Sequence, residues 1–379
     1  MIARIGLDYT SALNQRAGIG RYTRELVNAL ATTAPLDWAA HYRLFVAEAR
    51  ASFRAPRLGA NFCWHPSRLT ERNLHRLWFR LRLPLSIENW TGPLDLFHAP
   101  DFFLPPVKRS TRTLLTVHDL SFVREPESVM PGMARHLNTW VPRSVQRADH
   151  VIAVSESTRH DLIDLYQTPP EKISVLYHGV GAEFRPILDA ARLATVRRKY
   201  SLPEPPLILS VGTVQPRKNY QRLLQAFAHV RPAASLVIAG GQGWYFDEIL
   251  AEVRRLHLES RVRFLGFVDE ADLPLLYNLA TVFVYPSLYE GFGLPVLEAM
   301  ACGVPVVASR RSALPEVVGA AGQLIDPVDI EGMAGALTEL LADETLRRQL
   351  SAAGLGQAAR FSWARTAEQL VSLYQSLLS

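Results

Sequence analysis

Short runs of apolar and β-branched residues recur along this chain, and segments with helical periodicity lie between many of them. In the first half, six such runs are bounded by turn residues: 4–7, 43–46, 94–98, 113–117, 151–154 and 173–176. Continuous apolar runs of this length are typical of parallel strands that are buried on both faces. Segments 21–31 and 157–166 have helical patterns. Because strands and helices alternate, the sequence predicts right-handed βαβ units in a doubly wound α/β sheet.

A proline-rich hinge separates this region from a second one with the same pattern. The hinge contains Phe184-Arg185-Pro186, a charged helix and Ser201-Leu-Pro-Glu-Pro-Pro206. A second set of strands is predicted at 207–211, 235–239, 262–265, 282–285 and 304–308, with helices such as 221–230 and 272–280 between them. At 379 residues, the chain is long enough for two domains. We therefore predict an N-terminal domain over 1–185, a C-terminal domain over 186–362 and a final helix over 363–379.

The composition is that of an ordinary globular protein. Hydrophobic residues make up 48% of the chain, and the 25 prolines and 22 glycines form no repeat. Arg4 and Asp8 interrupt any secretory apolar core, and no run of about 18 apolar residues occurs. Cys63 and Cys302 are the only cysteines, which fits a reducing compartment and excludes a cysteine-rich zinc site. These features favour a cytoplasmic protein.

Positive charge is concentrated in the first half of the chain. Residues 1–185 contain 23 Lys and Arg against 17 Asp and Glu, whereas the remainder contains 18 against 19. A basic first half indicates an anionic partner surface.

Four arginines recur every four residues at Arg68, Arg72, Arg76 and Arg80, with apolar residues on a different face. The segment 68–82 is therefore expected to form a basic amphipathic helix. Two interpretations stay open. The helix can be a core helix with a solvated arginine edge, or it can lie on an anionic membrane, where each basic residue contributes about 1 kcal/mol.

The most specific motif follows a predicted strand and precedes a predicted helix. It reads Pro286-Ser-Leu-Tyr-Glu290-Gly-Phe-Gly-Leu-Pro-Val-Leu-Glu298-Ala-Met-Ala-Cys-Gly303. Its glycines allow a sharp turn and a close approach of the backbone to a ligand. A strand, a glycine turn and a helix N-terminus together form an anion site. The structural alternative for Glu298 is simple compensation of the helix dipole.

This segment resembles the Glu-x7-Glu motif of retaining glycosyltransferases with the GT-B fold, in the family numbered four. The resemblance implies that Glu290 contacts the donor sugar and that Glu298 hydrogen-bonds the nucleotide ribose. Backbone amides of Phe292, Gly293 and Leu294 are then expected to face the diphosphate or the sugar. It also implies two doubly wound Rossmann-like domains facing across a cleft, with the final helix crossing back onto the first domain.

A cationic pair follows the first strand of the second domain, in Ser210-Val-Gly-Thr-Val-Gln-Pro-Arg217-Lys218-Asn219. Cations at the carboxyl end of a strand can neutralise a diphosphate leaving group, although a solvated turn fits the spacing equally well. The family resemblance implies the first role for Lys218. The chain has Thr213 where the family often has an arginine, and Arg217 is expected to substitute for it.

Three further segments are similar to family elements. Ala17-Gly18-Ile-Gly20 resembles the glycine-rich loop beneath the donor, and Gly18 and Gly20 are expected to lie there. His118 resembles the interdomain histidine that contacts the donor sugar near its reactive carbon, although histidines at strand ends are often structural. Phe267 and Val268 resemble the turn that contacts the nucleobase, through the backbone.

These resemblances identify the chain as a retaining glycosyltransferase that depends on a nucleotide sugar. Gly-Ile-Gly-Arg-Tyr, His-Asp-Leu and Pro-Arg-Lys-Asn are similar to the subgroup of bacterial O-antigen mannosyltransferases. GDP-mannose is therefore the first choice of donor, with UDP-sugars still open, and a glycan or lipid-linked acceptor in cell-surface polysaccharide synthesis is expected. The sequence contains no Asp-x-Asp, so we expect neither a metal nor another cofactor. The family reaction implies same-face substitution, in which the leaving phosphate helps to deprotonate the acceptor hydroxyl.

Three other functions stay open at this point. A nucleotide-sugar epimerase and a glycan phosphorylase are also built from two similar domains. A phosphorylase needs a lysine that binds pyridoxal phosphate, and with four lysines the chain offers few candidates. A non-catalytic protein could use the basic half to bind nucleic acid or a membrane. Nucleic acid is not expected as a partner, because the slightly acidic second half carries the most specific motif.

Overall fold

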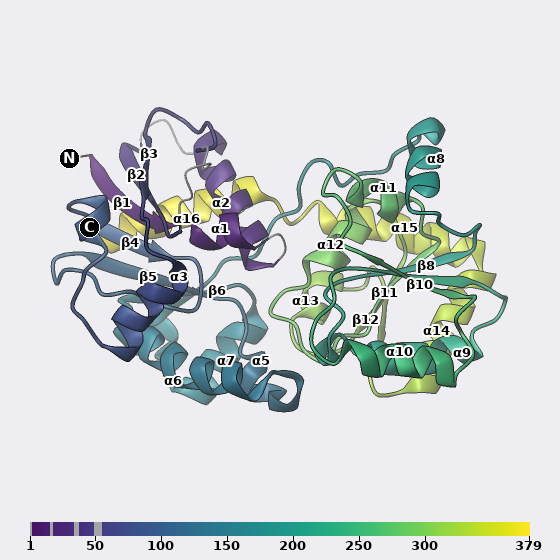
Figure 1. Ribbon diagram of the computed structural model, residues 1–379. Helices are drawn as coiled ribbons and strands as arrows, with labels where there is room; N and C mark the ends of the chain where they lie inside the picture. The colour runs from purple at the N-terminus through teal and green to yellow at the C-terminus, as the bar shows by residue number, and fades with distance from the viewer. Residues whose placement is uncertain (1, 16–17, 34–37, 49–54) are drawn as a thin grey trace. The chain divides into compact units, whose positions relative to one another are not determined.

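The computed structural model describes residues 2–15, 18–33, 38–48 and 55–379 (Figure 1). The chain forms two compact units. The first comprises Met1–Leu120, Gly132–Gly179 and Ser362–Ser379, and the second comprises Ser121–Pro131 and Val180–Phe361. Each unit contains one parallel sheet with helices on both faces, which confirms the predicted α/β class.

The division of the chain differs in detail from the predicted boundaries at 185 and 362. Val180 already belongs to the second unit, where its N–H donates to the carbonyl of Phe361 at 3.4 Å. Phe184 packs against Tyr277 with 5.9 Å between ring centroids. The segment Ser121–Pro131 is also grouped with the second unit, where Trp244 Nε1 donates to the carbonyl of Ser128 at 2.8 Å. Such contacts depend on tertiary packing, so hydrophobic periodicity along the chain cannot predict which unit a connecting segment belongs to.

The sheet of the first unit has seven parallel strands in the order β3-β2-β1-β4-β5-β6-β7. The six predicted strands are confirmed, and β3 is an addition. The strands are β1 (Ala3–Asp8), β2 (Ala40–Val46), β3 (Phe62–Pro66), β4 (Leu96–Ala99), β5 (Arg112–Val117), β6 (His150–Ala153) and β7 (Ile173–Val175). The register pairs Leu7 of β1 with Leu44 of β2 and with His98 of β4. The strand order reverses between β1 and β4, which is where ligands of such sheets bind.

Helices cover both faces of this sheet. They include α1 (Thr10–Asn14), α2 (Ile19–Thr33), α3 (Glu71–His75), α4 (Glu88–Thr91), α6 (Pro131–Arg147), α7 (Glu156–Tyr166) and α16 (Trp363–Leu378). Helices α2 and α16 pack side by side, and α16 buries Leu370, Val371 and Tyr374. The final helix therefore belongs to the first unit, although 182 residues of the second unit precede it in sequence (180–361).

The predicted amphipathic helix over 68–82 is shorter than expected. It begins at α3, where the Thr70 side chain accepts a hydrogen bond from the Asn73 N–H at 3.2 Å. The helix then passes into a π-helical turn, η1 (Arg76–Arg80), and ends where Arg82 adopts a φ of 54°. Arg68 and Arg82 thus lie outside the helix, because a Thr cap and a left-handed residue terminate it.

The sheet of the second unit has six parallel strands in the order β10-β9-β8-β11-β12-β13. They are β8 (Leu207–Val211), β9 (Ser235–Ala239), β10 (Val262–Gly266), β11 (Val282–Tyr285), β12 (Val306–Ser309) and β13 (Gln323–Ile325). Five of them were predicted. Here the order reverses between β8 and β11, so the loops that follow these two strands lie next to one another.

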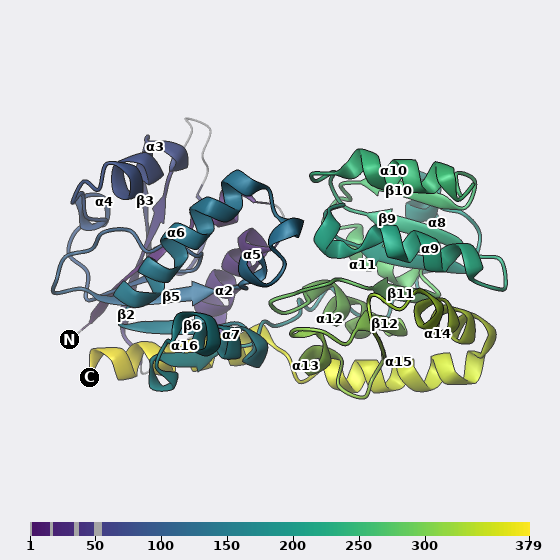
Figure 2. The ribbon, with the colours of Figure 1, turned by 90° about the horizontal axis from the view of Figure 1, so that it is seen from below.

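The helices of this unit form two layers, with α9, α10 and α14 on one face of the sheet and α11, α12 and α15 on the other (Figures 1 and 2). Their bounds are α8 (Ala190–Lys199), α9 (Tyr220–His229), α10 (Phe246–Arg255), α11 (Leu273–Asn278), α12 (Leu294–Ala301), α13 (Leu314–Val318), α14 (Ile330–Ala342) and α15 (Glu344–Ala358). Across the residues described in both units, no helix is long and apolar enough to cross a bilayer.

Candidate active site

The loops that follow β8 and β11 meet at the carboxyl edge of the second sheet. A single 3₁₀ turn, Pro216–Lys218, follows β8 and leads into α9. Asn219 adopts a φ of 60°, and its side chain donates to the carbonyls of Pro286 at 3.1 Å and Pro327 at 2.6 Å. This asparagine therefore fixes the cationic pair of the turn against the segment that follows β11.

The structure brings Arg217, Lys218 and Glu290 together. Lys218 Nζ donates to Glu290 Oε1 at 2.5 Å, and Arg217 Nη1 lies 3.0 Å from Glu290 Oε2. Arg217 also donates to the carbonyl of Tyr289 at 2.6 Å. Lys218 and Glu290 are each only 7% exposed, so this cluster is not the solvated turn that the sequence left open.

The two neighbouring cations affect the pKa of Glu290 more strongly than burial does. Burial alone would raise the pKa of Glu290, but the charges of Arg217 and Lys218, with the hydrogen bond from Lys218, lower that pKa to about 2. Glu290 is therefore ionised throughout the physiological range. Two cations against one carboxylate leave the cluster with a formal charge of +1, which favours binding of an anion.

Two residues outside the predicted set support Glu290 and Lys218. The Glu290 N–H donates to Ser312 Oγ at 2.8 Å. Lys218 Nζ donates to the hydroxyl of Tyr285 and lies 4.6 Å from the centre of its ring. Tyr285 ends a predicted strand next to the motif, which was a usable signal. Ser312 follows β12, and nothing in the sequence around it indicates a role in the site, because only the order of the strands brings it to Glu290.

The glycine turn and the second glutamate occupy the start of α12. Gly293 precedes the helix with a φ of 112°, a conformation that favours glycine. Glu298 is 2% exposed and accepts a hydrogen bond from the Tyr277 hydroxyl at 2.8 Å. Because Glu298 is the fifth residue of α12, it lies beyond the first turn, and dipole compensation does not explain its position. Phe292 packs against Phe361 at 5.7 Å between ring centroids, and Leu294 opens the helix.

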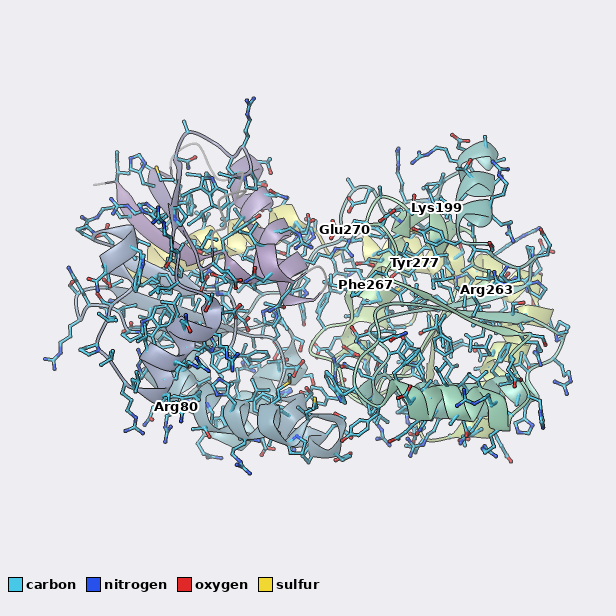
Figure 3. The ribbon with its side chains drawn as sticks, viewed as in Figure 1. Arg80, Lys199, Arg263, Phe267, Glu270 and Tyr277 are labelled. Carbon is cyan, nitrogen blue, oxygen red and sulfur yellow. The ribbon has the colours of Figure 1, made fainter. Side chains whose placement is uncertain are left out.

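Phe267 and Val268 follow β10 at the same edge of the sheet. The Phe267 side chain is 67% exposed, which is unusual for a large aromatic residue (Figure 3). Its ring lies against Gly241, where an added Cβ would be 2.5 Å from the ring. A Cβ at Gly240 would come within 2.1 Å of the Gly212 carbonyl oxygen, so glycine is needed where β8 and β9 end. The described residues contain no group of three or more His, Cys, Asp or Glu that could hold a metal ion.

In the first unit, His118 follows β5 and is 7% exposed. Its Nε2 lies 2.8 Å from the carbonyl oxygen of Pro100, and since a carbonyl only accepts, this nitrogen carries the proton. The ring packs edge-on against Tyr22 with centroids 4.8 Å apart. Burial lowers the pKa of His118 to about 4, although the Pro100 carbonyl and Asp119 act in the opposite direction.

The glycine-rich segment lies in the same unit. Gly18 has a φ of 60°, and its carbonyl accepts from the Tyr22 N–H at 3.0 Å. Gly20 lies in the first turn of α2, where an added Cβ would be 2.0 Å from the Gln15 carbonyl oxygen. Gly20 is thus required for local packing. Ala17, the first residue of the predicted loop, lies outside the described residues.

The neutral state of His118 predicts an acid-dependent loss of stability. Below pH 6.5 the unfolded chain binds a proton at this histidine, whereas the folded chain does not until about pH 4. Stability is therefore lost as the pH falls through this window, by about 2 kcal/mol at pH 5 from this residue alone. We expect His118→Gln, which can still donate to Pro100, to show a smaller difference in urea midpoint between pH 7.5 and pH 5. An unchanged difference would contradict the burial of a neutral histidine.

Two doubly wound parallel-sheet units, with a buried glutamate and cation cluster at the carboxyl edge of the second, define the GT-B class of glycosyltransferases. Comparison with known proteins agrees. Residues 194–357 match the family described as "Glycosyl transferases group 1", and residues 16–184 match "Glycosyltransferase Family 4".

Similar proteins support the same assignment. O-antigen chain mannosyltransferase B of Escherichia coli is 34% identical over 371 residues, which cover 95% of this chain and 96% of that protein. The serotype-specific mannosyltransferase WbdA of E. coli is 36% identical over 240 residues, 62% of this chain and 29% of WbdA. The structure of sucrose-phosphate synthase from Thermosynechococcus elongatus has a TM-score of 0.79 at 23% identity and covers 99% of both chains. The chain belongs to glycosyltransferase family 4 and is an enzyme of glycosyl transfer.

Proposed function

We propose that this glycosyltransferase is a retaining mannosyltransferase that uses GDP-mannose to extend a glycan or a lipid-linked acceptor in cell-surface polysaccharide synthesis. The observation that carries the donor site is the buried cluster of Arg217, Lys218 and Glu290 at the β8 and β11 loops. The choice of mannose rests on the similarity, over nearly the full length, to O-antigen chain mannosyltransferase B of E. coli.

In this proposal the two cations stabilise the diphosphate that leaves with the nucleotide. Negative charge develops on the leaving oxygen as the bond to the sugar breaks, and fixed cations in a water-poor site stabilise that charge strongly. The amides of Phe292, Gly293 and Leu294 at the start of α12 add donors and the positive end of a helix dipole. The protein then contributes positioning and charge stabilisation, and the leaving phosphate helps to deprotonate the acceptor hydroxyl.

The two glutamates hold the uncharged parts of the donor. A carboxylate can accept several hydrogen bonds, so Glu290 can bind a sugar hydroxyl while it also pairs with its cations. Glu298 is assigned to the ribose hydroxyls, with Tyr277 holding its orientation. Phe267 and Val268 are assigned to the base. By the family resemblance, His118 is assigned to the donor sugar, and Gly18 and Gly20 are assigned to the loop beneath the donor.

The proposed chemistry needs neither a metal nor a further cofactor, because Arg217 and Lys218 supply the charge that a divalent cation would otherwise supply. The acceptor side is assigned to the first unit, which carries the excess of positive charge. We place the enzyme in the cytoplasm, with peripheral contact to anionic membrane through the basic helix that starts at Glu71, and without a nucleic-acid partner.

A ligand panel tests this function. Calorimetry with GDP, UDP, ADP, dTDP and their sugar conjugates is expected to give a selective response to GDP and GDP-mannose, followed by transfer of labelled mannose to a mannosylated glycan acceptor. A selective response to UDP would retain the glycosyltransferase and overturn mannose from GDP-mannose. If none of these nucleotides or sugar conjugates binds, the assignment of the donor site is wrong.

A further inference from the structure

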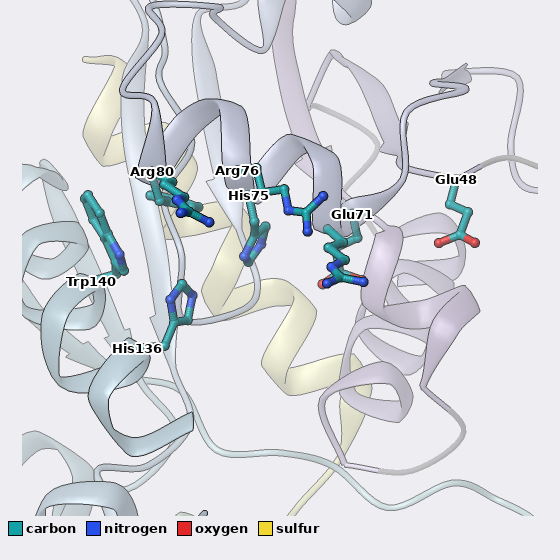
Figure 4. A pocket seen from close by; sticks show the side chains of 9 residues that line it. Glu48, Glu71, His75, Arg76, Arg80, His136 and Trp140 are labelled. Carbon is teal, nitrogen blue, oxygen red and sulfur yellow. The ribbon is translucent and has the colours of Figure 1, made fainter. Parts of the chain in front are cut away.

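A cavity lies wholly within the first unit and includes none of the residues assigned to the donor. Its volume is about 720 Å³, which is in the range of small-molecule sites. It lies between the α3–η1 helix and α6 (Figure 4). The residues that line it are Glu48, Glu71, Arg72, His75, Arg76, Phe79, Arg80, His136 and Trp140.

Three arginines form the basic side of this cavity. Arg72, Arg76 and Arg80 recur at every fourth residue of the α3–η1 helix and line the cavity. In the part of the chain that the structure describes, none of these guanidinium groups makes an ion pair or a hydrogen bond. Other arginines of the same unit do pair, such as Arg4 with Asp95 at 2.6 Å. Unpaired guanidinium groups beside one cavity favour a phosphate, which they bind through two parallel hydrogen bonds.

Aromatic rings form the wall beside the arginines. His75 packs on Phe79 and Phe79 on Trp140, each pair with 5.1 Å between ring centroids. Burial, with the nearby His136, lowers the pKa of His75 to about 4, so this ring is neutral at pH 7. The wall therefore offers apolar and aromatic surface, and the positive charge comes from the arginines.

The opposite end of the cavity is acidic. Glu48 and Glu71 lie at one end and Trp140 and Arg80 at the other (Figure 4). Glu71 Oε2 accepts a hydrogen bond from Asn14 Nδ2 at 3.3 Å, which ties it to the end of α1. Carboxylates are acceptors for sugar hydroxyls. The cavity thus presents acceptors for hydroxyl groups at one end and donors for an anion at the other.

Exposed leucines flank the same helix. Leu81 is 61% exposed and Leu83 is more than a third exposed, and both follow Arg80 in the chain. A ligand that carries sugar hydroxyls, a phosphate and an apolar chain, in this order, would meet the carboxylates and arginines in the cavity and the leucines just beyond Arg80.

We infer that this cavity binds the phosphate or diphosphate ester that joins the acceptor sugar to its lipid, with Arg72, Arg76 and Arg80 holding the phosphate oxygens. The identity of the ligand as an acceptor rests on the proposed function. The cavity differs from a general membrane-binding surface in one testable respect. Arg68 and Arg82 belong to the same basic segment but do not line it.

The experiment uses the full chain and geranyl diphosphate as a soluble probe, with geraniol and inorganic diphosphate as partial probes. Calorimetry is carried out also in a Lys218→Met background, which separates this cavity from the cation pair of the second unit. We expect geranyl diphosphate to bind, and Arg76→Gln and Arg80→Gln each to weaken binding about tenfold. The double variants Arg76→Gln/Arg80→Gln and Arg68→Gln/Arg82→Gln each remove two positive charges, and only the second is expected to leave affinity unchanged.

Three results would overturn the inference. One is no binding of geranyl diphosphate, and another is equal weakening of its binding by the double variants Arg76→Gln/Arg80→Gln and Arg68→Gln/Arg82→Gln. The third is equally tight binding of inorganic diphosphate, which would indicate a free phosphate ligand.

A second experiment measures binding to vesicles of phosphatidylcholine and phosphatidylglycerol. Selective loss of vesicle binding in Arg76→Gln and Arg80→Gln, without binding of the probe, would assign the cavity to a membrane headgroup instead.

The outcome for this cavity and the outcome for the proposed function are separable. Binding of the probe needs neither donor nor transfer, and GDP binding is measured on the same samples. Probe binding without GDP binding would retain the cavity and remove the donor assignment. GDP binding and mannose transfer without probe binding would retain the function and remove the cavity.

Discussion

Replacement of Glu290 by Ala is expected to abolish transfer, a loss of at least about 100-fold, while GDP binding is kept or becomes tighter. The carboxylate holds the donor sugar in our proposal, so its removal affects the reacting group. It also neutralises one of the two cations beside it, and the variant cluster carries a formal charge of +2. We expect GDP to raise the melting temperature of Glu290→Ala at least as much as that of the wild-type protein.

Folding must be controlled in this experiment, because loss of one partner of a buried ion pair costs about 3–5 kcal/mol. Glu290→Gln serves as the second variant, since it keeps the shape of the side chain and a hydrogen-bond acceptor. Circular dichroism should show native secondary structure for both variants. A folded variant that retains full turnover would contradict the sugar-positioning role of Glu290.

Replacement of Lys218 by Met is expected to act in the opposite direction on GDP binding. The variant loses a buried cation that bonds Glu290 and Tyr285, and the formal charge of the cluster falls from +1 to 0. We expect the affinity for GDP to fall at least tenfold and transfer to fall about 100- to 1,000-fold, because the developing charge of the leaving diphosphate loses a fixed cation. Calorimetry with GDP and a transfer assay measure the two effects.

Lys199→Met provides the matched control in the same unit. Lys199 lies on the surface of α8 and pairs with Asp269 and Asp272, each at 2.6 Å. Pairs exposed to this degree contribute little, so neither GDP affinity nor transfer should change. If Lys218→Met and Lys199→Met both bind GDP with wild-type affinity, the assignment of Lys218 to the diphosphate is wrong.

Most strands of both sheets could be predicted from the sequence, because a strand buried on both faces is a continuous apolar run. The two strands that the sequence did not reveal, β3 and β13, are both at sheet edges. Strand β3 reads Phe-Cys-Trp-His-Pro and has polar, partly exposed positions, since an edge strand faces solvent on one side. Its amino-acid pattern is therefore not that of a buried strand.

The limits of the amphipathic helix were less predictable than its existence. Arginines every four residues predicted one helix over 68–82, but the helix spans only α3 and η1. Capping by Thr70 and the left-handed conformation of Arg82 are local features that periodicity does not weigh. The shorter helix is what separates the cavity-lining arginines from Arg68 and Arg82.

The sequence by itself determined the α/β class, the doubly wound pattern and the Glu290 motif, because these features depend on local periodicity and on residues close together in the chain. Only the tertiary structure decided which distant side chains meet. Strands β8 and β11 are neighbours in the sheet, so the loops that carry Lys218 and Glu290 adjoin although 72 residues separate them. Packing of α6 beside the α3–η1 helix brought Trp140 to Arg80 in the same way. Such contacts follow from the order of strands and the packing of layers, and hydrophobic periodicity along one chain does not encode that order.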